Sequence, residues 1–217
     1  MSQDLTPQPV EIGSARLKGL LSVPAEPRGL VIFAHGSGSS RHSPRNRHVA
    51  EGLHRQRFAS LLMDLLTPDE ERDRNNVFDI PLLAQRLAIA TEWAASLPEV
   101  AALPVGYFGA STGAAAALVS ASLPEARVAA IVSRGGRPDL AGATLASVRA
   151  PTLLIVGSLD TGVIELNRSA LTHIQAPKEL VIIRGARHLF EEGETLDEVI
   201  THAGRWFGLY LEKTRDA

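Results

Sequence analysis

The length, charge and composition of the chain restrict what it can be. Its 217 residues suit a single domain, residues 1–217, with a core large enough to need no disulfide. The 22 Lys and Arg residues against 24 Asp and Glu give a formal net charge of -2, which excludes a chain-wide surface for nucleic acid or an acidic membrane. The absence of cysteine excludes disulfides, thiolate metal ligands and a cysteine nucleophile.

The N-terminal residues lack the basic and then apolar layout of a signal peptide. No run approaches the ~20 apolar residues that a membrane helix needs. We therefore expect a cytoplasmic protein that is a monomer or a homodimer.

The predicted elements alternate between strands and helices after a short antiparallel pair over residues 9–23. Apolar runs typical of buried strands occupy residues 30–34, 59–64, 105–108, 128–132, a run that begins at 151, and 180–183. Helical patterns follow over 44–56, 80–97, the segment from 112 to about 123, 162–174 and 195–211, with a brief piece near 140–147. The charged run 69–74 is interpreted as a solvated loop, and Thr195 as the cap of the last helix.

This alternation predicts an α/β fold, a three-layer α/β/α sandwich on a mostly parallel sheet. No insertion between the strands is long enough for a large cap domain, so we expect a shallow, open pocket. Ligands of such sheets bind at the carboxyl ends of the strands. The residues of interest in this sequence all fall at such ends.

Residues 109–113 read Gly-Ala-Ser-Thr-Gly, the spacing G-x-S-x-G of a nucleophile elbow. Ser111 would occupy a strained turn between a strand and a helix, so its neighbours Gly109 and Gly113 must be almost free of side chain. The helix that follows directs backbone N–H groups and its positive dipole end toward the place where negative charge develops in acyl transfer. The alternative is a tight turn with no chemical role.

Three residues in the chain order serine, acid, histidine follow apolar runs directly: Ser111, Asp160 and His188. Imidazole is the side chain whose proton affinity suits activation of a serine hydroxyl, so His188 is the expected base. Asp160 would hold the other ring N–H, fix the tautomer and stabilise the imidazolium. Alternatively, His188 is a surface loop histidine, or Asp160 is a helix N-cap. Asp64 and Asp139 are the competing acids.

The loop after the first apolar run is expected to supply the second oxyanion donor. Ser37 follows His35 and Gly36 directly after that strand. We expect the backbone N–H groups of Ser37 and Thr112 to form the oxyanion hole, with their side chains mattering less. His35 is interpreted as a brace for its loop and not as a reacting group.

Basic side chains follow two of the predicted strand ends: Arg41, His42 and Arg45 after the first glycine-rich loop, and Arg134 and Arg137 after the strand at 128–132. Guanidinium groups suit carboxylate or phosphate. Arg41, His42 and Arg137 are therefore candidates to bind an anionic part of an ester substrate. The alternative is that the arginines are solvated or form internal ion pairs with Asp139 and Glu191.

Five segments together resemble a known group of enzymes: His-Gly-Ser-Gly at 35–38, Asp-Leu-Leu-Thr-Pro at 64–68, Gly-Ala-Ser-Thr-Gly at 109–113, Leu-Asp at 159–160 and Ala-Arg-His at 186–188. Nearly end to end, the chain resembles the α/β-hydrolase superfamily and, within it, the dienelactone-hydrolase-like serine hydrolases. The resemblance implies no metal and no organic cofactor. Dienelactone hydrolases proper use a cysteine nucleophile, and because this chain has no cysteine, general ester chemistry is favoured over dienelactone itself.

These observations predict a serine hydrolase that cleaves carboxylic esters through an acyl-enzyme intermediate. Its expected partner is a small-molecule ester, with no nucleic acid and no membrane. Two alternatives stay open: a thioesterase or amidase with the same triad, and a hydrolase-shaped protein that binds a ligand without turnover.

Overall fold

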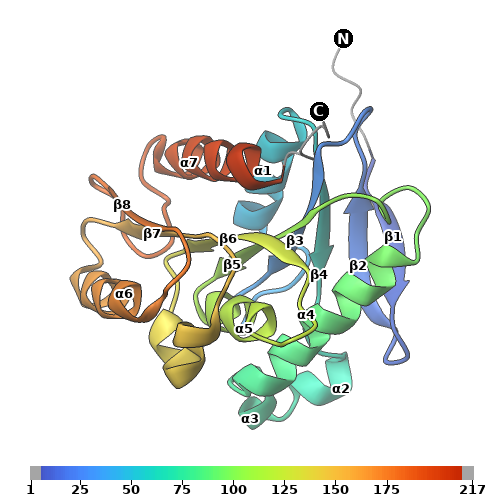
Figure 1. Ribbon diagram of the computed structural model, residues 1–217, viewed down its shortest axis with the longest axis horizontal. Helices are drawn as coiled ribbons and strands as arrows, with labels where there is room; N and C mark the ends of the chain where they lie inside the picture. Colours follow the sequence, from blue (N-terminus) through green and yellow to red (C-terminus); the bar gives the residue numbers. More distant parts are fainter. Residues whose placement is uncertain (1–5, 212–217) are drawn as a thin grey trace.

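A mixed sheet forms the centre of the computed structural model, which describes residues 6–211 (Figure 1). Its strands over these residues are β1 (Gln8–Ile12), β2 (Leu17–Ser22), β3 (Gly29–Ala34), β4 (Phe58–Met63), β5 (Val105–Ala110), β6 (Val128–Arg134), β7 (Thr152–Gly157) and β8 (Lys178–Ile183). They are arranged in the order β1-β2-β4-β3-β5-β6-β7-β8. β2 pairs antiparallel with β1 and β4, and the other neighbours pair in parallel. The predicted α/β fold with a mostly parallel sheet is confirmed.

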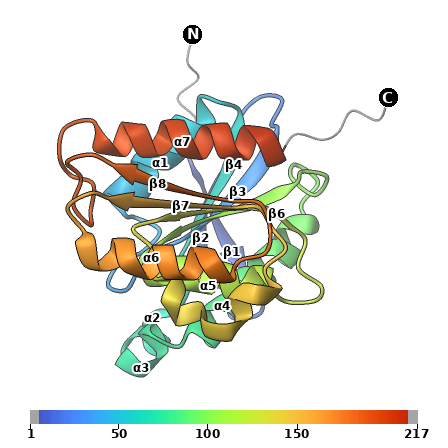
Figure 2. The same ribbon diagram turned by 60° about the vertical axis from the view of Figure 1, so that its left-hand side comes forward.

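Helices cover both faces of this sheet. They are α1 (Pro44–His54), α2 (Pro68–Glu71), α3 (Arg74–Val77), α4 (Ile80–Ala95), α5 (Thr112–Ala121), α6 (Thr161–His173), α7 (Thr195–Tyr210) and a 3₁₀ segment, η1 (Pro138–Ser147). Figures 1 and 2 show α1 and α7 on one face, with α4, α5 and α6 on the other. Within residues 6–211, no helix combines the length and the apolar character needed to cross a membrane.

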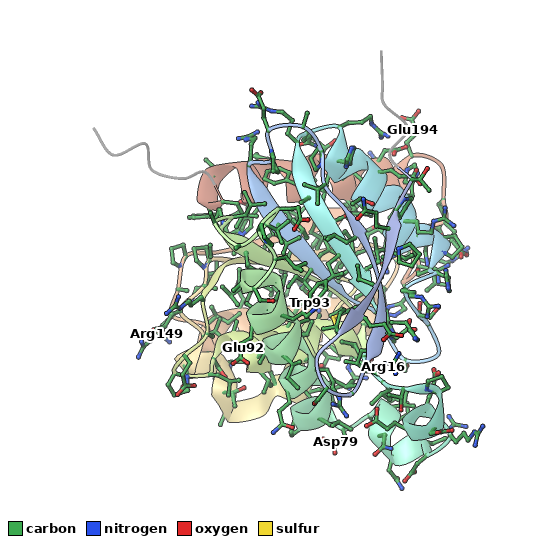
Figure 3. The ribbon with its side chains drawn as sticks, turned by 90° about the vertical axis from the view of Figure 1, so that its right-hand side faces the viewer. Arg16, Asp79, Glu92, Trp93, Arg149 and Glu194 are labelled. Atoms are coloured by element: carbon green, nitrogen blue, oxygen red, sulfur yellow. The ribbon has the colours of Figure 1, made fainter. Side chains whose placement is uncertain are left out.

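Local sequence signals explain where the long helices begin. The Ser43 hydroxyl accepts a hydrogen bond from the Asn46 N–H at the start of α1, and Pro44 occupies the first turn. In the same way, the Asp79 carboxylate accepts the Leu82 N–H at the start of α4. Figure 3 shows Asp79 at this end of α4, with Trp93 farther along the helix. These caps satisfy N–H groups that have no partner inside the helix.

Two apolar layers hold the sheet between the helices. Beneath α1 and α7, the rings of Phe33 and Phe108 lie with centroids 5.0 Å apart. On the other face, the predicted inward positions of α4 are all buried: Leu83, Leu87, Ala90 and Ala94. Full burial of a side chain such as Leu or Phe contributes roughly 1.5–3 kcal/mol. Both faces of the central strands are therefore anchored, and their carboxyl ends form a rigid edge.

The charged run at 69–74 departs from the expected loop. Residues 69–71 belong to the short helix α2 and residue 74 begins α3, with residues 72 and 73 between them, and most of the run is exposed. Thr67 and Glu70 form a capping box, in which the Thr67 hydroxyl accepts the Glu70 N–H and the Glu70 carboxylate accepts the Thr67 N–H. Glu70 also pairs with Arg86 of α4. The prediction of a loop was wrong because these caps stabilise a turn of helix in solvent.

Thr195 does not cap the last helix as predicted. Glu194 occupies the N-cap position of α7, without a side-chain cap, and Thr195 is the first helical residue. The Thr195 side chain is buried, and its hydroxyl makes no hydrogen bond within residues 6–211. The inward positions of this helix are buried as expected: Val199, Ala203, Trp206 and Phe207.

Candidate active site

Ser111 lies in a strained turn between β5 and α5. Its φ of 51° and ψ of -122° are rarely adopted by residues other than glycine. The turn is tied to the end of the neighbouring strand, because the Ser111 N–H donates to the carbonyl oxygen of Arg134 at 3.4 Å. Ser111 occupies the N-cap position of α5, but its hydroxyl does not cap the helix. The strain therefore orients a hydroxyl that has no role in holding the helix.

The glycines on either side of Ser111 allow close backbone contacts. A Cβ atom at Gly109 would lie 2.4 Å from the Cα of Ala114 in the following helix. A Cβ atom at Gly113 would lie 2.2 Å from the carbonyl oxygen of Ala34, at the end of β3. Both distances are far below van der Waals contact, so any side chain at these positions would push the elbow away from the sheet.

His188 and Asp160 are brought together from the ends of β8 and β7. The Nδ1 atom of His188 donates to Oδ2 of Asp160 at 2.7 Å, with the two side chains 40% and 19% exposed. Asp160 also occupies the N-cap position of α6, yet its side chain makes no capping bond. The Asp160 carboxylate therefore binds the imidazole and not the helix, and Nε2 of His188 is left for another partner.

The end of β6 connects the His188 loop with the serine turn. A Cβ atom at Gly135 would lie 3.1 Å from the carbonyl oxygen of His188. Gly135 directly follows Arg134, whose carbonyl oxygen accepts the Ser111 N–H. Three distant segments of the chain, around Ser111, Gly135 and His188, are therefore in contact at one edge of the sheet.

The competing acids are engaged elsewhere. Asp64 accepts the Arg41 backbone N–H at 2.7 Å and forms an ion pair with the Arg41 guanidinium. Asp139 accepts two hydrogen bonds from Arg137, at 2.9 and 2.7 Å. Of the three candidate acids, Asp160 is the one bonded to His188.

The predicted oxyanion residues also lie together. The Ser37 backbone N–H donates to the Thr112 hydroxyl oxygen at 3.0 Å. The loop lies directly on the serine turn, since a Cβ atom at Gly36 would be 3.0 Å from the Cβ of Ser111. Thr112 is 4% exposed. Sequence reasoning missed the contact of the Thr112 hydroxyl, because the partners are 75 residues apart and no local pattern connects them.

His35 braces the loop that carries Ser37. Its Nε2 accepts the Leu65 N–H at 3.1 Å, and its Nδ1 donates to the carbonyl oxygen of Gly36 at 2.9 Å. Burial lowers the pKa of the imidazole, although the hydrogen bond to the Gly36 carbonyl and the charges of Asp64 and Glu71 oppose this. A protonated ring could not accept the Leu65 N–H, so this arrangement needs neutral His35.

The predicted substrate residues differ in their surroundings. Arg41 and Arg137 are paired with Asp64 and Asp139, and the hydrogen bonds that Arg137 donates to Asp139 raise the pKa of Arg137. His42 is exposed, and its backbone N–H donates to the Ser40 hydroxyl at 3.2 Å. Both arginines therefore already have a carboxylate partner within the protein.

Two hollows lie at opposite ends of β5. The smaller, of about 60 Å³, is lined in part by Ser37, Leu65 and Thr112 at the carboxyl end. The larger, of about 810 Å³, lies beside Val105 at the amino end and the last turns of α4 and α5. Of these two hollows, the smaller adjoins the candidate site. Residues 6–211 contain no group of three or more His, Cys, Asp or Glu side chains that could hold a metal ion.

The sheet order, the layers and the strained serine turn define an α/β-hydrolase-fold hydrolase. The sequence profile of the Dienelactone hydrolase family matches residues 17–203, and the chain belongs to that family. A crystal structure of dienelactone hydrolase from Anabaena variabilis is 52% identical, with a TM-score of 0.91, over 96% of this chain and 99% of that one. A dienelactone hydrolase-like promiscuous phosphotriesterase from metagenomic libraries, P91, shares the fold at 18% identity, with a TM-score of 0.76 over 96% of this chain and 99% of that one.

A protein of Mycobacterium tuberculosis, provisionally named a phosphoribosyl transferase, is 60% identical over 198 residues. The match covers 91% of this chain but 45% of that protein, so the chain spans about half the length of this relative.

Proposed function

We propose that the chain is a serine esterase that cleaves carboxylic esters through an acyl-enzyme intermediate. Ser111 is the nucleophile, His188 is the general base and acid, and Asp160 orients the imidazole. The backbone N–H groups of Ser37 and Thr112 are the proposed oxyanion donors, and the Ser37 N–H shares its hydrogen between the Thr112 hydroxyl and the oxyanion. The observation that carries the proposal is the combination of a serine at φ 51° with the 2.7 Å hydrogen bond between His188 and Asp160.

In the first step, the Ser111 Oγ attacks the ester carbonyl carbon while Nε2 of His188 takes the hydroxyl proton. The carbonyl oxygen becomes an oxyanion, which the two backbone N–H groups stabilise. The tetrahedral intermediate then breaks its bond to the alcohol oxygen, and the imidazolium returns the proton to that oxygen. The alcohol leaves, and the acyl group stays on Ser111.

In the second step, water repeats the attack on the acyl carbon. His188 takes a proton from the water and gives it to the Ser111 Oγ as the acyl bond breaks. The carboxylic acid is released, and the serine hydroxyl is restored. Asp160 is not protonated in either step, because it only holds the Nδ1 proton and stabilises the imidazolium.

Labelling with a fluorophosphonate tests this proposal, since such a probe reacts with an activated serine and not with an ordinary hydroxyl. We expect mass spectrometry to find the label on the peptide that contains Ser111. Ser111→Ala should prevent labelling and reduce kcat for a simple ester by roughly 10⁵–10⁶. Ser122→Ala, at the end of α5 and away from the turn, is the control that should keep both the labelling and the kcat. An unlabelled Ser111, or a Ser111→Ala variant with most of its activity, contradicts the proposal.

The same triad supports two related functions. Thioesters and amides react by the same steps, and a panel of matched esters, thioesters and amides distinguishes them by kcat/KM. A hydrolase-shaped binding protein would take up a ligand without turnover and would leave Ser111 unlabelled.

The name of the Mycobacterium tuberculosis relative suggests phosphoribosyl transfer as a second candidate. The family match over residues 17–203 favours hydrolysis for the shared segment, which covers 45% of that longer protein. Incubation with phosphoribosyl diphosphate and an acceptor base tests this candidate. Release of diphosphate that depends on the base would support it.

A further inference from the structure

Arg134 is a buried cation at the strand end whose backbone is bonded to the turn of the proposed nucleophile. It is the last residue of β6 and is 7% exposed. Its backbone carbonyl oxygen accepts the Ser111 N–H, and its guanidinium lies 6.0 Å from the ring centre of Phe190. Phe190 follows His188 by two residues. The guanidinium therefore lies between the loop that carries His188 and the first turn of α1, on a residue whose backbone is bonded to the serine turn.

The Arg134 side chain has few partners for a buried charge. Its Nη2 donates to the Asn46 Oδ1 at 3.5 Å, at the limit of a hydrogen bond. Its Nε and Nη1 are buried and have no partner among the described residues. Burial, with the charge of Arg45 as a smaller cause, lowers the pKa of Arg134 to about 10. At neutral pH the group still carries its charge.

The second cation of this region is also incompletely paired. Nη1 of Arg45 donates to Glu191 at 2.7 Å, but its Nε is buried without a partner within residues 6–211. The Glu191 side chain is 60% exposed. Of these two guanidinium groups, only that of Arg45 has a carboxylate partner among the described residues, and this carboxylate lies mostly in solvent. An uncompensated buried charge lowers the stability of a protein, so stability alone does not explain this arrangement.

We propose that Arg134 and Arg45 form a site for a carboxylate or phosphate group, and that the ester cleaved at Ser111 carries such a group. The unpaired Nε and Nη1 of Arg134 and Nε of Arg45 are donors that anionic oxygens satisfy. Glu191 holds Arg45 in the absence of substrate, and the substrate anion takes its place. The substrate part of this inference rests on the proposed function, whereas the anion site itself needs no turnover.

The contrast with the arginines predicted from sequence supports this choice. Arg41 and Arg137 are each neutralised by a carboxylate of their own, Asp64 and Asp139. Binding a substrate anion there would require breaking an existing ion pair. Arg134 has unpaired donors and no carboxylate partner among the described residues, so an anion adds hydrogen bonds without displacing any from it.

Thermal unfolding of the Ser111→Ala protein tests the site without turnover. At constant ionic strength set with sodium chloride, inorganic phosphate or acetate should raise Tm. Adding Arg134→Met should abolish this rise. In the absence of the anion, the Tm of this variant should be unchanged or higher, because an uncompensated buried charge is removed. Arg168→Met, in an exposed pair with Glu165 on α6, is the control that should keep the rise. Response to phosphate, acetate or both identifies the preferred anion.

Three outcomes overturn the site: no rise in Tm with either anion, a rise that survives Arg134→Met, or a rise equally lost in Arg168→Met. If the Arg134→Met protein does not fold, Arg45→Met takes its place with the same expected loss. Glu191→Gln should lower the anion concentration that is needed for half of the rise, because the competing carboxylate is gone. An unchanged requirement overturns the role given to Glu191.

Matched esters test the substrate class. Phenyl hemisuccinate and phenyl butyrate differ in a carboxylate on the acyl part, and 4-acetoxybenzoate and phenyl acetate differ in one on the alcohol part. For each pair, the quantity measured is kcat/KM of the anionic ester divided by kcat/KM of the neutral ester. In at least one pair, Arg134→Met should lower this ratio by roughly tenfold or more, the size expected for the loss of one hydrogen bond to a charged group. Unchanged ratios in both pairs overturn the substrate class. An unlabelled Ser111 with intact phosphate binding would remove the esterase proposal and keep the anion site.

Discussion

The two flanks of Ser111 are held in place by different means. On the acid–base flank, the side chains of Asp160 and His188 come from the ends of two parallel strands and meet through one hydrogen bond. On the oxyanion flank, the proposed donors are backbone N–H groups of Ser37 and Thr112, and their segments are connected by a buried hydroxyl. One flank depends on side-chain chemistry and the other on backbone position.

This difference determines which substitutions should affect each flank. His188 and Asp160 are partly exposed, so their loss removes a reacting group with little loss of packing. The oxyanion flank is supported by Gly113, which touches the end of β3, and by His35, which holds the segment after β4. Substitutions at these supports should change stability and rate together, although neither residue is proposed to touch the substrate.

Of the two flanks, the acid–base flank is expected to show the larger effect. Asp160→Asn should lower kcat for a neutral ester by roughly 10⁴, because an amide presents the wrong hydrogen-bonding group to Nδ1 and favours the wrong tautomer. The free energy of unfolding should change little, because the side chain does not cap α6. Steady-state kinetics and urea denaturation measure both. Asp139→Asn is the matched control and should keep kcat, whereas the opposite ranking would transfer the role of the acid to Asp139.

On the oxyanion flank, Gly113→Ala should lower both stability and rate. The added methyl would lie 2.2 Å from the Ala34 carbonyl oxygen, a rigid backbone atom at the end of β3. Overpacking of this kind costs about 1–3 kcal/mol or more, and the elbow should move away from the oxyanion loop. Denaturant unfolding measures the first effect and kcat the second. Gly162→Ala, where a Cβ meets no atom within 4 Å, should change neither. A stable, fully active Gly113→Ala protein would show that the elbow tolerates displacement.

The fold was predictable from sequence because its signals are local. Continuous apolar runs mark strands covered on both faces, and G-x-S-x-G marks the turn at Ser111. The helix α2 also had a readable signal, since Thr67 and Glu70 are spaced as a capping box around Pro68. The charges of residues 69–74 favoured a solvated loop, and the capping-box spacing was not taken into account. The prediction of a loop was therefore wrong.

The state of the arginines was only partly predictable from sequence. The alternative of internal ion pairs with Asp139 and Glu191 is confirmed for Arg137 and Arg45. Asp64 lies 23 residues after Arg41, and no local spacing identifies that ion pair. The incomplete pairing of Arg134 depends on which carboxylates the packed helices bring near β6. Sequence reasoning placed Arg134 in a loop, whereas the structure extends β6 to include it. Its side chain is therefore buried under the helices of one face.

A smaller effect is expected from the hydroxyl of Thr112. Thr112→Val keeps the size of the side chain and the proposed backbone donor but removes the acceptor of the Ser37 N–H. The Ser37 amide should lose its orientation, and kcat should fall by roughly tenfold, the equivalent of one hydrogen bond. Thr112→Ser retains the hydroxyl and should recover most of the rate. Equal rates in the valine and serine variants would mean that the backbone alone matters, as sequence reasoning expected.

The smallest effect concerns the pH dependence of stability through His35. Burial lowers its folded pKa below the ordinary 6.5, so at mildly acidic pH the unfolded chain binds more protons than the folded one. The stabilisation is complete above about pH 6.5 and is lost as the pH falls toward and through the folded pKa. His35→Asn and His35→Gln have no titrating group, so their free energy of unfolding should fall less steeply with acid than that of the parent protein. Urea denaturation across this range measures the slopes. An unchanged slope in both variants would mean that the Leu65 N–H keeps its partner on acidification and that the oxyanion flank does not depend on neutral His35.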